Sequence, residues 1–174
     1  MIDIAAADFG IRQLHARFAD AVWRQDGAEF GACFASNGVW KIAGQEFVGG
    51  AAIGAACGAL LGRCSNIHLI TGLPILNFDG DIVRGRLAMT EFARMNDGST
   101  AMTIGWYHDR YVEEGGLWRF ARRHWSFKYR GPPDLTGAFV DTPNYGAFPD
   151  GPADDEATYV RPGGALFAPA MKRR

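Results

Sequence analysis

The sequence feature that most constrains the fold is a series of four long segments separated by short turns. The segments cover residues 66–79, 81–95, 99–113 and 116–129. The turns between them read Asp79-Gly80-Asp81, Asn96-Asp97-Gly98 and Glu114-Gly115-Gly116. Turns of this length and composition join neighbouring antiparallel strands. We therefore expect these segments to form an antiparallel meander, and glycines at 72, 85 and 105 are places where bulges could bend such long strands.

The first part of the chain has helical periodicity. Apolar residues within 8–26 recur every three or four positions, at Ile11, Leu14, Phe18 and Val22. This spacing predicts an amphipathic helix over 8–26 with Asp8 as its N-cap. Further helices are predicted over 28–35 and 50–63, with a turn at Asn37-Gly38 and strands over 39–42 and 45–48 between them. Helices followed by an antiparallel sheet indicate an α+β fold.

A change in composition near residue 130 divides the chain into two parts. Residues 1–130 are expected to form one domain, and residues 131–174 hold seven of the eight prolines together with five aromatic residues, Phe139, Tyr145, Phe148, Tyr159 and Phe167. Disordered linkers are usually poor in aromatic residues. We therefore expect this tail to pack on its own domain or on a neighbouring subunit.

Composition excludes several classes of function. The 174 residues carry a formal net charge of −1, which does not favour nucleic-acid binding. No apolar run approaches the ~18 residues that a membrane span needs. Three cysteines without a C-x-x-C pair, and an N-terminus without a basic run, favour a reducing, cytoplasmic setting.

Cofactor motifs are also absent from the sequence. It has no phosphate-binding glycine motif and no nucleophile elbow, and its four histidines lack metal-ligand spacing. We therefore expect no metal and no cofactor, which leaves proton transfer as the available chemistry.

Two residues are candidates for that chemistry. Asp26 lies within a quarter turn of Phe18 and Val22 on the predicted helix, so its carboxylate points to the core or a pocket rim, or else lies exposed at the Asp26-Gly27 turn. His68 has apolar neighbours on both sides. It is either a half-buried sheet residue or, if a carboxylate faces it, a general base.

A third candidate lies in the last predicted strand. By period two, Arg123 shares a face with Ala121, Trp125 and Phe127. An arginine among aromatic residues could bind an anionic group; alternatively it is an exposed edge charge or a cation–π partner of Trp125. On the preceding strand Tyr107 alternates with Trp106 and His108, and the pattern leaves open which set faces inward.

These pieces together resemble a known family. A long helix ending near Asp26, a strand with Trp40, a Gly/Ala-rich helix, Asn66-Ile67-His68 and a last strand beginning Gly116-Leu117-Trp118-Arg119-Phe120 follow in order. Over residues 5–130 this resembles the SnoaL-like branch of the nuclear transport factor 2-like superfamily. The resemblance implies a cone-shaped, strongly curved antiparallel sheet wrapped around three N-terminal helices, with a deep apolar pocket.

Within that branch, the pattern is most similar to the scytalone dehydratase, bile-acid dehydratase and hexachlorocyclohexane dehydrochlorinase group. The resemblance implies a cofactor-free pair of Asp26 and His68, assisted by Arg123. It also implies a substrate pocket that includes Trp40, Lys41, Tyr107, Trp125 and Phe127. The Lys or Tyr that those enzymes carry near the aspartate is replaced here by Ala21 and Val22. The assisting acid is therefore expected elsewhere, for instance at Lys41, Tyr107 or Arg24.

The resulting hypothesis is a cofactor-independent lyase acting on a hydrophobic, aromatic small molecule. The reaction could be dehydration, dehydrohalogenation, or loss of a small carbonyl fragment from a lignin-type aromatic dimer. One alternative is an isomerase or polyketide-type cyclase that uses the same pair. The other is a non-catalytic binding module, or a protein like the small subunit of a ring-hydroxylating dioxygenase. The resemblance also implies a homo-oligomer, either a trimer or a dimer.

Overall fold

The computed structural model describes residues 2–159 and contains three helices and seven strands. The helices are α1 (Ile4–Trp23), α2 (Gly27–Ala32) and α3 (Gly50–Leu61). The strands are β1 (Phe34–Ile42), β2 (Gln45–Val48), β3 (Cys64–Thr71), β4 (Ile75–Asp79), β5 (Ile82–Met95), β6 (Thr100–Glu114) and β7 (Leu117–Gly131).

The first helix is shifted toward the N-terminus relative to the predicted span of 8–26. Asp3, not Asp8, is its N-cap and accepts hydrogen bonds from two backbone N–H groups in the first turn. The helix ends at Trp23 because Gln25 adopts a positive φ of 55°, which breaks the helical ladder. Asp26 consequently lies beyond α1 and becomes the N-cap of α2.

The seven strands form one mixed sheet in the order β2-β1-β7-β6-β5-β3, with β4 also paired to β5. The predicted meander is confirmed for β5, β6 and β7, which pair antiparallel in sequence order. Parallel pairing of β1 with β7 makes the sheet mixed. The predicted turn at Asn37-Gly38 is wrong, because both residues lie inside β1, at a break in its register with β7.

The predicted single strand over 66–79 is in fact two strands. β3 pairs with the second half of β5 and β4 pairs with the first half, so the two strands follow one another along the same edge of β5. Gly72 to Pro74 separate them. Proline has no N–H to donate to a sheet ladder and commonly ends a strand.

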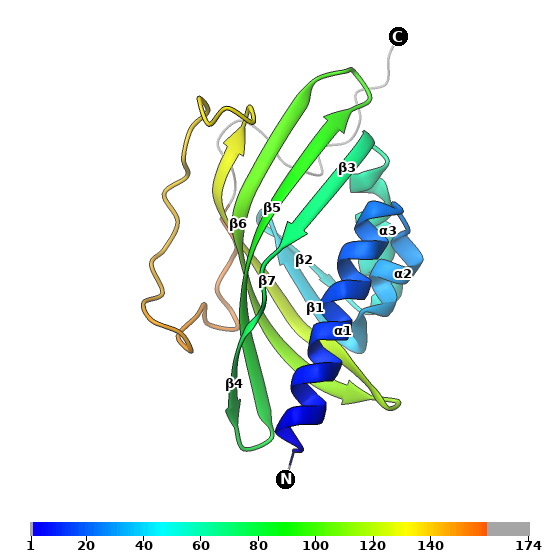
Figure 1. Ribbon diagram of the computed structural model, residues 1–174, viewed down its shortest axis with the longest axis vertical. Coiled ribbons are helices and arrows are strands. Elements are labelled where there is room, and N and C mark those ends of the chain that lie inside the picture. The colour runs from blue at the N-terminus through cyan, green and yellow to red at the C-terminus, as the bar shows by residue number, and fades with distance from the viewer. Residues whose placement is uncertain (1, 160–174) are drawn as a thin grey trace.

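The three helices lie on one side of the curved sheet, and residues 132–159 run over the other (Figure 1). The expected α+β architecture is confirmed. Aromatic rings fill the space between α1, α2 and the sheet: Phe18 contacts Phe30 and Phe120, and Phe30 contacts Trp40. The core therefore lies on the concave face of the sheet.

Two bulges in β7 change which of its residues face that core. Tyr111 and Arg110 pair with Phe120 and Arg122, which leaves Ala121 as an extra residue. Ile104 and Gly105 pair with Tyr129 and Phe127, which leaves Lys128 as a second one. The prediction that Ala121 shares a face with Arg123 is wrong for this reason, and the buried Phe120 takes that place.

The described part of the tail is held to the outer face of the sheet by polar and aromatic contacts. The Asp154 carboxylate forms ion pairs with Arg110 and Arg122, and Tyr145 packs edge-on against His108. Phe167, one of the aromatic residues expected to anchor the tail, lies outside the described residues.

Candidate functional site

A small cavity lies between the helices and the concave face of the sheet. Its volume is about 50 Å³. Helix residues of its lining include Phe18, Val22, Phe30, Cys57 and Leu60, and strand residues include Trp40, Ile42, Leu69, Met89, Glu91, Thr103, Tyr107, Trp125, Phe127 and Arg130. Aromatic side chains therefore occupy much of the pocket that the resemblance implies.

Four of the predicted pocket residues line this cavity: Trp40, Tyr107, Trp125 and Phe127. The Tyr107 and Trp125 rings lie 4.7 Å apart, and those of Trp125 and Phe127 lie 5.2 Å apart. The set on β6 that faces inward is the one containing Tyr107 and Thr103. Burial raises the pKa of the Tyr107 phenol, so this hydroxyl remains protonated at neutral pH.

Three polar cavity residues were not predicted from the sequence: Glu91, Thr103 and Arg130. Arg130 donates a 2.6 Å hydrogen bond to Thr103 Oγ1, and its Nη1 lies 3.9 Å from Glu91 Oε1. Burial among apolar side chains raises the pKa of Glu91, and the charge of Arg130 opposes that rise. If side chains alternated regularly along β7 after Phe127, Tyr129 would face the cavity and Arg130 would face away from it. The bulge at Lys128 reverses this order and brings Arg130 to the cavity.

The structure gives Arg123 a partner inside the protein. Its side chain faces the core and not the solvent, is fully buried and forms an ion pair with Asp109. Its guanidinium carbon lies 3.7 Å from the centre of the Tyr107 ring and 4.1 Å from that of Phe18. Arg123 therefore lies behind the aromatic residues of the cavity and is not part of its lining.

The Arg123–Asp109 pair belongs to a buried hydrogen-bond network. Tyr111 donates to Asp109 Oδ2 over 3.2 Å, and His15 Nε2 lies 2.9 Å from the Tyr111 hydroxyl. A His15 ring that carries its proton on Nε2 completes this chain, and its Nδ1 can then accept from Arg123. Burial and the nearby Arg123 charge lower the pKa of His15, which keeps the imidazole neutral.

Asp26 has a structural role at the start of α2. Its carboxylate accepts a hydrogen bond from the backbone N–H of Glu29 and forms an ion pair with Arg24 over 3.0 Å. The Glu29 bond and the Arg24 charge lower the pKa of Asp26, so it is ionised at neutral pH.

His68 lies on β3 next to the end of α1. Its ring is 4.0 Å from the Trp23 ring, and the Trp23 indole N–H donates to the backbone oxygen of Leu69. Leu69 lines the cavity and His68, one residue before it, does not. Within residues 2–159, no hydrogen bond or ion pair joins His68 to Asp26, so the structure does not bring the expected pair together.

The other two expected assisting groups lie away from the cavity. Lys41 lies on the outer face of β1, where its ammonium donates to backbone oxygens of Asp154 and Glu156 and pairs with Glu46. Arg24 pairs with Asp20 and Asp26 at the exposed end of α1. Of the proposed assisting acids, only Tyr107 faces the cavity.

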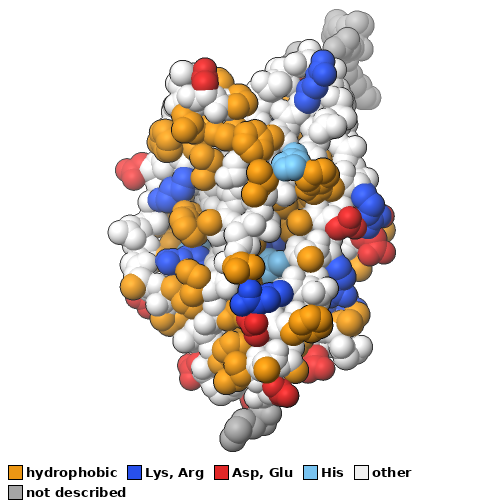
Figure 2. Space-filling view, in the orientation of Figure 1, with side chains coloured by type: hydrophobic (Ala, Val, Ile, Leu, Met, Phe, Trp, Pro, Cys, Tyr) orange, Lys and Arg blue, Asp and Glu red, His pale blue; other side chains and the backbone are white. Residues whose placement is uncertain are grey.

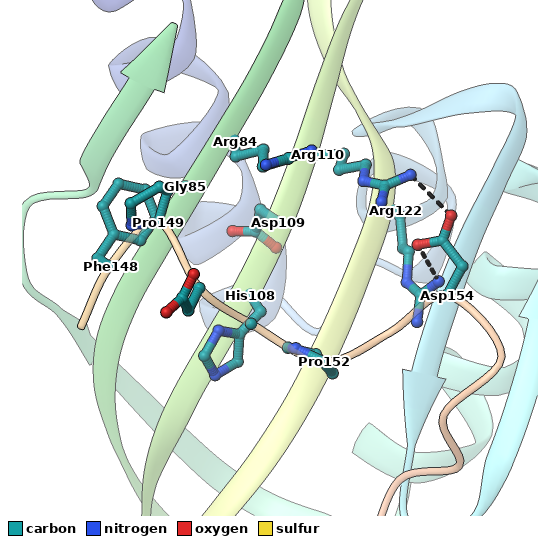
Figure 3. Close-up of a pocket in the computed structure, with 12 residues that line it drawn as sticks. Arg84, Gly85, His108, Asp109, Arg110, Arg122, Phe148, Pro149, Pro152 and Asp154 are labelled. Atoms are coloured by element: carbon teal, nitrogen blue, oxygen red, sulfur yellow. Dashed lines mark hydrogen bonds and ion pairs between the residues drawn. The ribbon is translucent and has the colours of Figure 1, made fainter. Parts of the chain in front are cut away.

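A second cavity, of about 270 Å³, lies between the outer face of the sheet and the tail (Figure 3). Arg84, Arg110 and Arg122 extend into it from three neighbouring strands, and Asp154 of the tail bridges two of them. His108 also lines it, and burial lowers the pKa of His108 to about 4. Its lining is more polar than that of the inner cavity, and two of its three arginines are paired with Asp154.

Neither a metal site nor a membrane span is found in the part of the chain that the structure describes. Among residues 2–159, no three His, Cys, Asp or Glu side chains come close enough to hold a metal ion. In the same range, no helix has both the length and the apolar character that crossing a bilayer requires.

Comparison with known proteins places this geometry in a family. The model of the SnoaL-like domain matches residues 5–124. No curated protein matches the sequence. Solved structures with the same fold include a variant of Rv3472 from Mycobacterium tuberculosis, a protein of unknown function. The TM-score is 0.62, and the identity is 26% over 68% of this chain and 70% of that chain.

Two further structures share the fold at lower identity. One is the hexachlorocyclohexane dehydrochlorinase LinA-type3 from Novosphingobium barchaimii, with a TM-score of 0.68 and 16% identity over 80% of this chain and 97% of that chain. The other is a scytalone dehydratase candidate from Novosphingobium aromaticivorans, with a TM-score of 0.65 and 16% identity over 75% of this chain and 89% of that chain. The family match covers well over half of the sequence, including the three helices and most of the curved sheet. The chain belongs to the SnoaL-like domain family.

Proposed function

We propose that this chain is a cofactor-independent lyase that removes a proton from a hydrophobic, aromatic small molecule bound on the concave face of the sheet. The inner cavity is the observation that carries the proposal. Its lining is mainly apolar and aromatic, and it contains a few converging polar groups. Small-molecule sites commonly have this composition.

The names of the structural neighbours are consistent with an elimination. A dehydrochlorinase and a scytalone dehydratase candidate share the fold, although identities of 16% support only the fold and not the substrate. We extend the lyase reaction to this chain as a proposal, with dehydration, dehydrohalogenation and loss of a carbonyl fragment from a lignin-type dimer as the candidate reactions.

Substrate binding requires movement of side chains around the cavity. Pockets for small molecules typically have volumes of roughly 300–1,000 Å³, whereas this cavity has about 50 Å³. Leu60 is only partly buried, so it can turn outward without disturbing the core. Trp125 and Tyr107 would then contact the aromatic ring of the substrate.

His68 is the base that the resemblance implies, and Asp26 is the group that would orient it. Proton removal by His68 would require its ring to leave Trp23 and turn toward the cavity. In the same state Asp26 would have to exchange its bond with Arg24 for one with His68. Arg123 would act on a developing anion only if the side chains between it and the cavity moved aside.

The same contacts favour a second candidate function, a non-catalytic module that binds aromatic molecules. Asp26 caps a helix and His68 packs on a tryptophan, so both residues have structural roles. If the protein is a binding module, an aromatic ligand in the cavity would quench the fluorescence of Trp125. The ligand would then be released chemically unchanged.

Turnover of a substrate panel tests the proposal. The panel would contain aryl β-hydroxy ketones, chlorinated cyclohexanes and lignin-type aryl dimers, and mass spectrometry would identify the products. Loss of water, hydrogen chloride or a carbonyl fragment supports a lyase, and an unchanged mass with a new structure supports an isomerase or cyclase. Binding without any product supports the module.

Variants separate the roles of the two residues. His68→Ala and Asp26→Asn should each lower turnover by about 10²-fold or more if the pair is catalytic. Asp20→Asn is the matched control, because Asp20 also pairs with Arg24 but lies exposed on α1. Wild-type turnover in His68→Ala would rule out His68 as the base.

We also propose that the protein forms a homo-oligomer in the cytoplasm. Figure 2 shows apolar side chains spread over the face that carries α1, β3 and β4, and Phe9, Ile70 and Leu73 are among the exposed apolar residues. This face is where a second copy of the chain would pack.

The cysteines are consistent with the cytoplasm. Cys33, Cys57 and Cys64 are free thiols, which suits a reducing compartment.

A further inference from the structure

Glu91, Thr103 and Arg130 form one continuous row across the sheet. Register pairs join Leu69 of β3 to Glu91 of β5, Glu91 to Thr103 of β6, and Thr103 to Arg130 of β7. All four side chains line the inner cavity. Backbone pairing therefore fixes a carboxyl, a hydroxyl and a guanidinium next to one another on the cavity side.

Within this row the Glu91 carboxyl group has only a long ion pair, with Arg130. Among residues 2–159, no hydrogen bond reaches it, and its separation of 3.9 Å from Arg130 Nη1 is too long for one. Thr103 takes the Arg130 hydrogen bond instead. The buried pair of Arg123 and Asp109, in contrast, is joined by two hydrogen bonds.

The exposure of the row indicates that a ligand can reach it. The side chains of Glu91 and Arg130 keep 22% and 16% of their surface exposed, whereas Arg123 and Asp109 keep none. Tyr107, Trp125 and Phe127 line the same cavity. An aromatic ring placed against these three residues would direct a short polar substituent toward Glu91 and Arg130.

We propose that Glu91 takes and returns the proton in the reaction of this cavity, and that Arg130 binds the carbonyl oxygen of an aromatic carbonyl compound. The assignment rests on the proposed function and names a base and a substrate class for it. Burial favours the uncharged form of Glu91, which makes its carboxylate a stronger base than an exposed one.

Dehydration of a β-hydroxy ketone, one of the candidate reactions of the proposed function, needs no further reactant. The Glu91 carboxylate takes a proton from the carbon next to the carbonyl group, while Arg130 stabilises the negative charge that develops on the carbonyl oxygen. The electron pair of the broken C–H bond forms the C=C bond as the C–O bond of the β-hydroxyl breaks. The departing hydroxyl takes the proton from Glu91, so water leaves and the carboxylate is restored.

Hydrogen exchange on a simple ketone tests the assignment directly. The probe is 4-phenylbutan-2-one in D2O, and proton NMR measures the loss of its hydrogens next to the carbonyl. We expect the wild type to accelerate exchange and Glu91→Gln to lower that acceleration by about 10²-fold or more. Glu113→Gln, an exposed glutamate on β6 outside the cavity, is the matched control and should match the wild type.

The pH profile distinguishes a base from a structural carboxyl group. Exchange by the wild type should rise with pH and level off above the ordinary titration range of glutamate, and Glu91→Gln should lose this step. Arg130→Gln should slow exchange about tenfold or more.

Glu91→Gln should remain folded. The substitution keeps the shape of the side chain and matches the uncharged form that burial favours, so circular dichroism should show the wild-type fold.

The outcomes separate this inference from the proposed function. Exchange that survives in Glu91→Gln but is lost in His68→Ala overturns the role of Glu91 and leaves the lyase proposal intact. No exchange by the wild type overturns both the substrate class and the assignment, whereas the lyase proposal is decided by product formation from the wider panel.

Discussion

Arg123 and Asp109 form a two-bond ion pair that is completely enclosed by the protein. Arg123 Nε lies 3.0 Å from Asp109 Oδ1 and Nη2 lies 3.1 Å from Oδ2, and neither side chain has exposed surface. The two residues are register partners on β7 and β6. Their pairing fixes the position of the guanidinium against the Tyr107 ring, which lines the cavity on its other side.

Asp109→Asn should destabilise the fold strongly. The variant leaves a buried guanidinium without a counter-charge, and breaking a buried pair in this way costs about 3–5 kcal/mol. Urea denaturation monitored by circular dichroism measures the free energy of unfolding. The double variant Asp109→Asn with Arg123→Met should recover part of the loss, because it removes the uncompensated charge.

An exposed pair provides the control for this prediction. Asp8→Asn removes the ion pair with Arg12 on the surface of α1, where a pair contributes about 0–1 kcal/mol. Asp109→Asn with a loss no larger than that of Asp8→Asn would contradict a buried, charged pair.

The sequence pattern predicted the layers of this fold better than its inward-facing residues. Turn motifs placed β5, β6 and β7 correctly, because short glycine turns constrain the chain locally. The bulges at Ala121 and Lys128 depend on pairing with β6 and leave no local signature, so strict alternation failed beyond them. Arg130 was overlooked for this reason.

Candidate site residues differed in how far the pattern could place them. Trp125 and Phe127 were placed on the cavity face correctly. The segment from Arg123 to Phe127 contains no bulge, so its side chains alternate regularly between the two faces of the sheet. Asp26 was assigned to the end of α1, with an exposed turn at Asp26-Gly27 as the alternative. A positive φ at Gln25 ends the helix before Asp26, so the structure agrees better with the turn. Lys41 alternates with Trp40, so the two could not both face the cavity.

His124 should make the fold sensitive to acid. Burial, together with the nearby charges of Arg122, His108 and Lys41, lowers the pKa of His124 to about 3. The unfolded chain binds a proton on this histidine below about pH 6.5, whereas the folded chain does not until about pH 3. The stability that depends on neutral His124 is therefore complete above pH 6.5 and is lost as the pH falls.

His124→Gln tests this dependence. Between pH 7.5 and pH 4.5 the variant should lose about 1–3 kcal/mol less stability than the wild type, measured by urea denaturation at both pH values. Equal losses in the two proteins would show that His124 does not remain neutral in the folded state.

Asp26 should contribute to stability as a helix cap whether or not it contributes to catalysis. Asp26→Ala removes the acceptor for the Glu29 N–H and should cost about 1 kcal/mol. Asp26→Asn keeps a side-chain oxygen at the same place, so thermal denaturation should show a much smaller loss. An Asp26→Asn protein that unfolds as easily as Asp26→Ala would indicate that charge, through Arg24 and the dipole of α2, matters more than the capping bond.

Gly105 should be required for the position of Trp125 over the cavity. A Cβ atom at Gly105 would lie 2.4 Å from the Trp125 ring and 2.4 Å from the backbone oxygen of Ser126. Because the backbone oxygen cannot turn aside, Gly105→Ala should cost about 1–3 kcal/mol and displace the indole. Gly72→Ala is the matched control, since its Cβ would meet its nearest neighbour at an ordinary 3.7 Å.

Urea denaturation gives the stability of both variants, and the emission spectrum of the tryptophans reports the displacement. A Gly105→Ala protein with the stability and emission of Gly72→Ala would mean that β6 and β7 can separate here, and that Trp125 is not fixed over the cavity by their close approach.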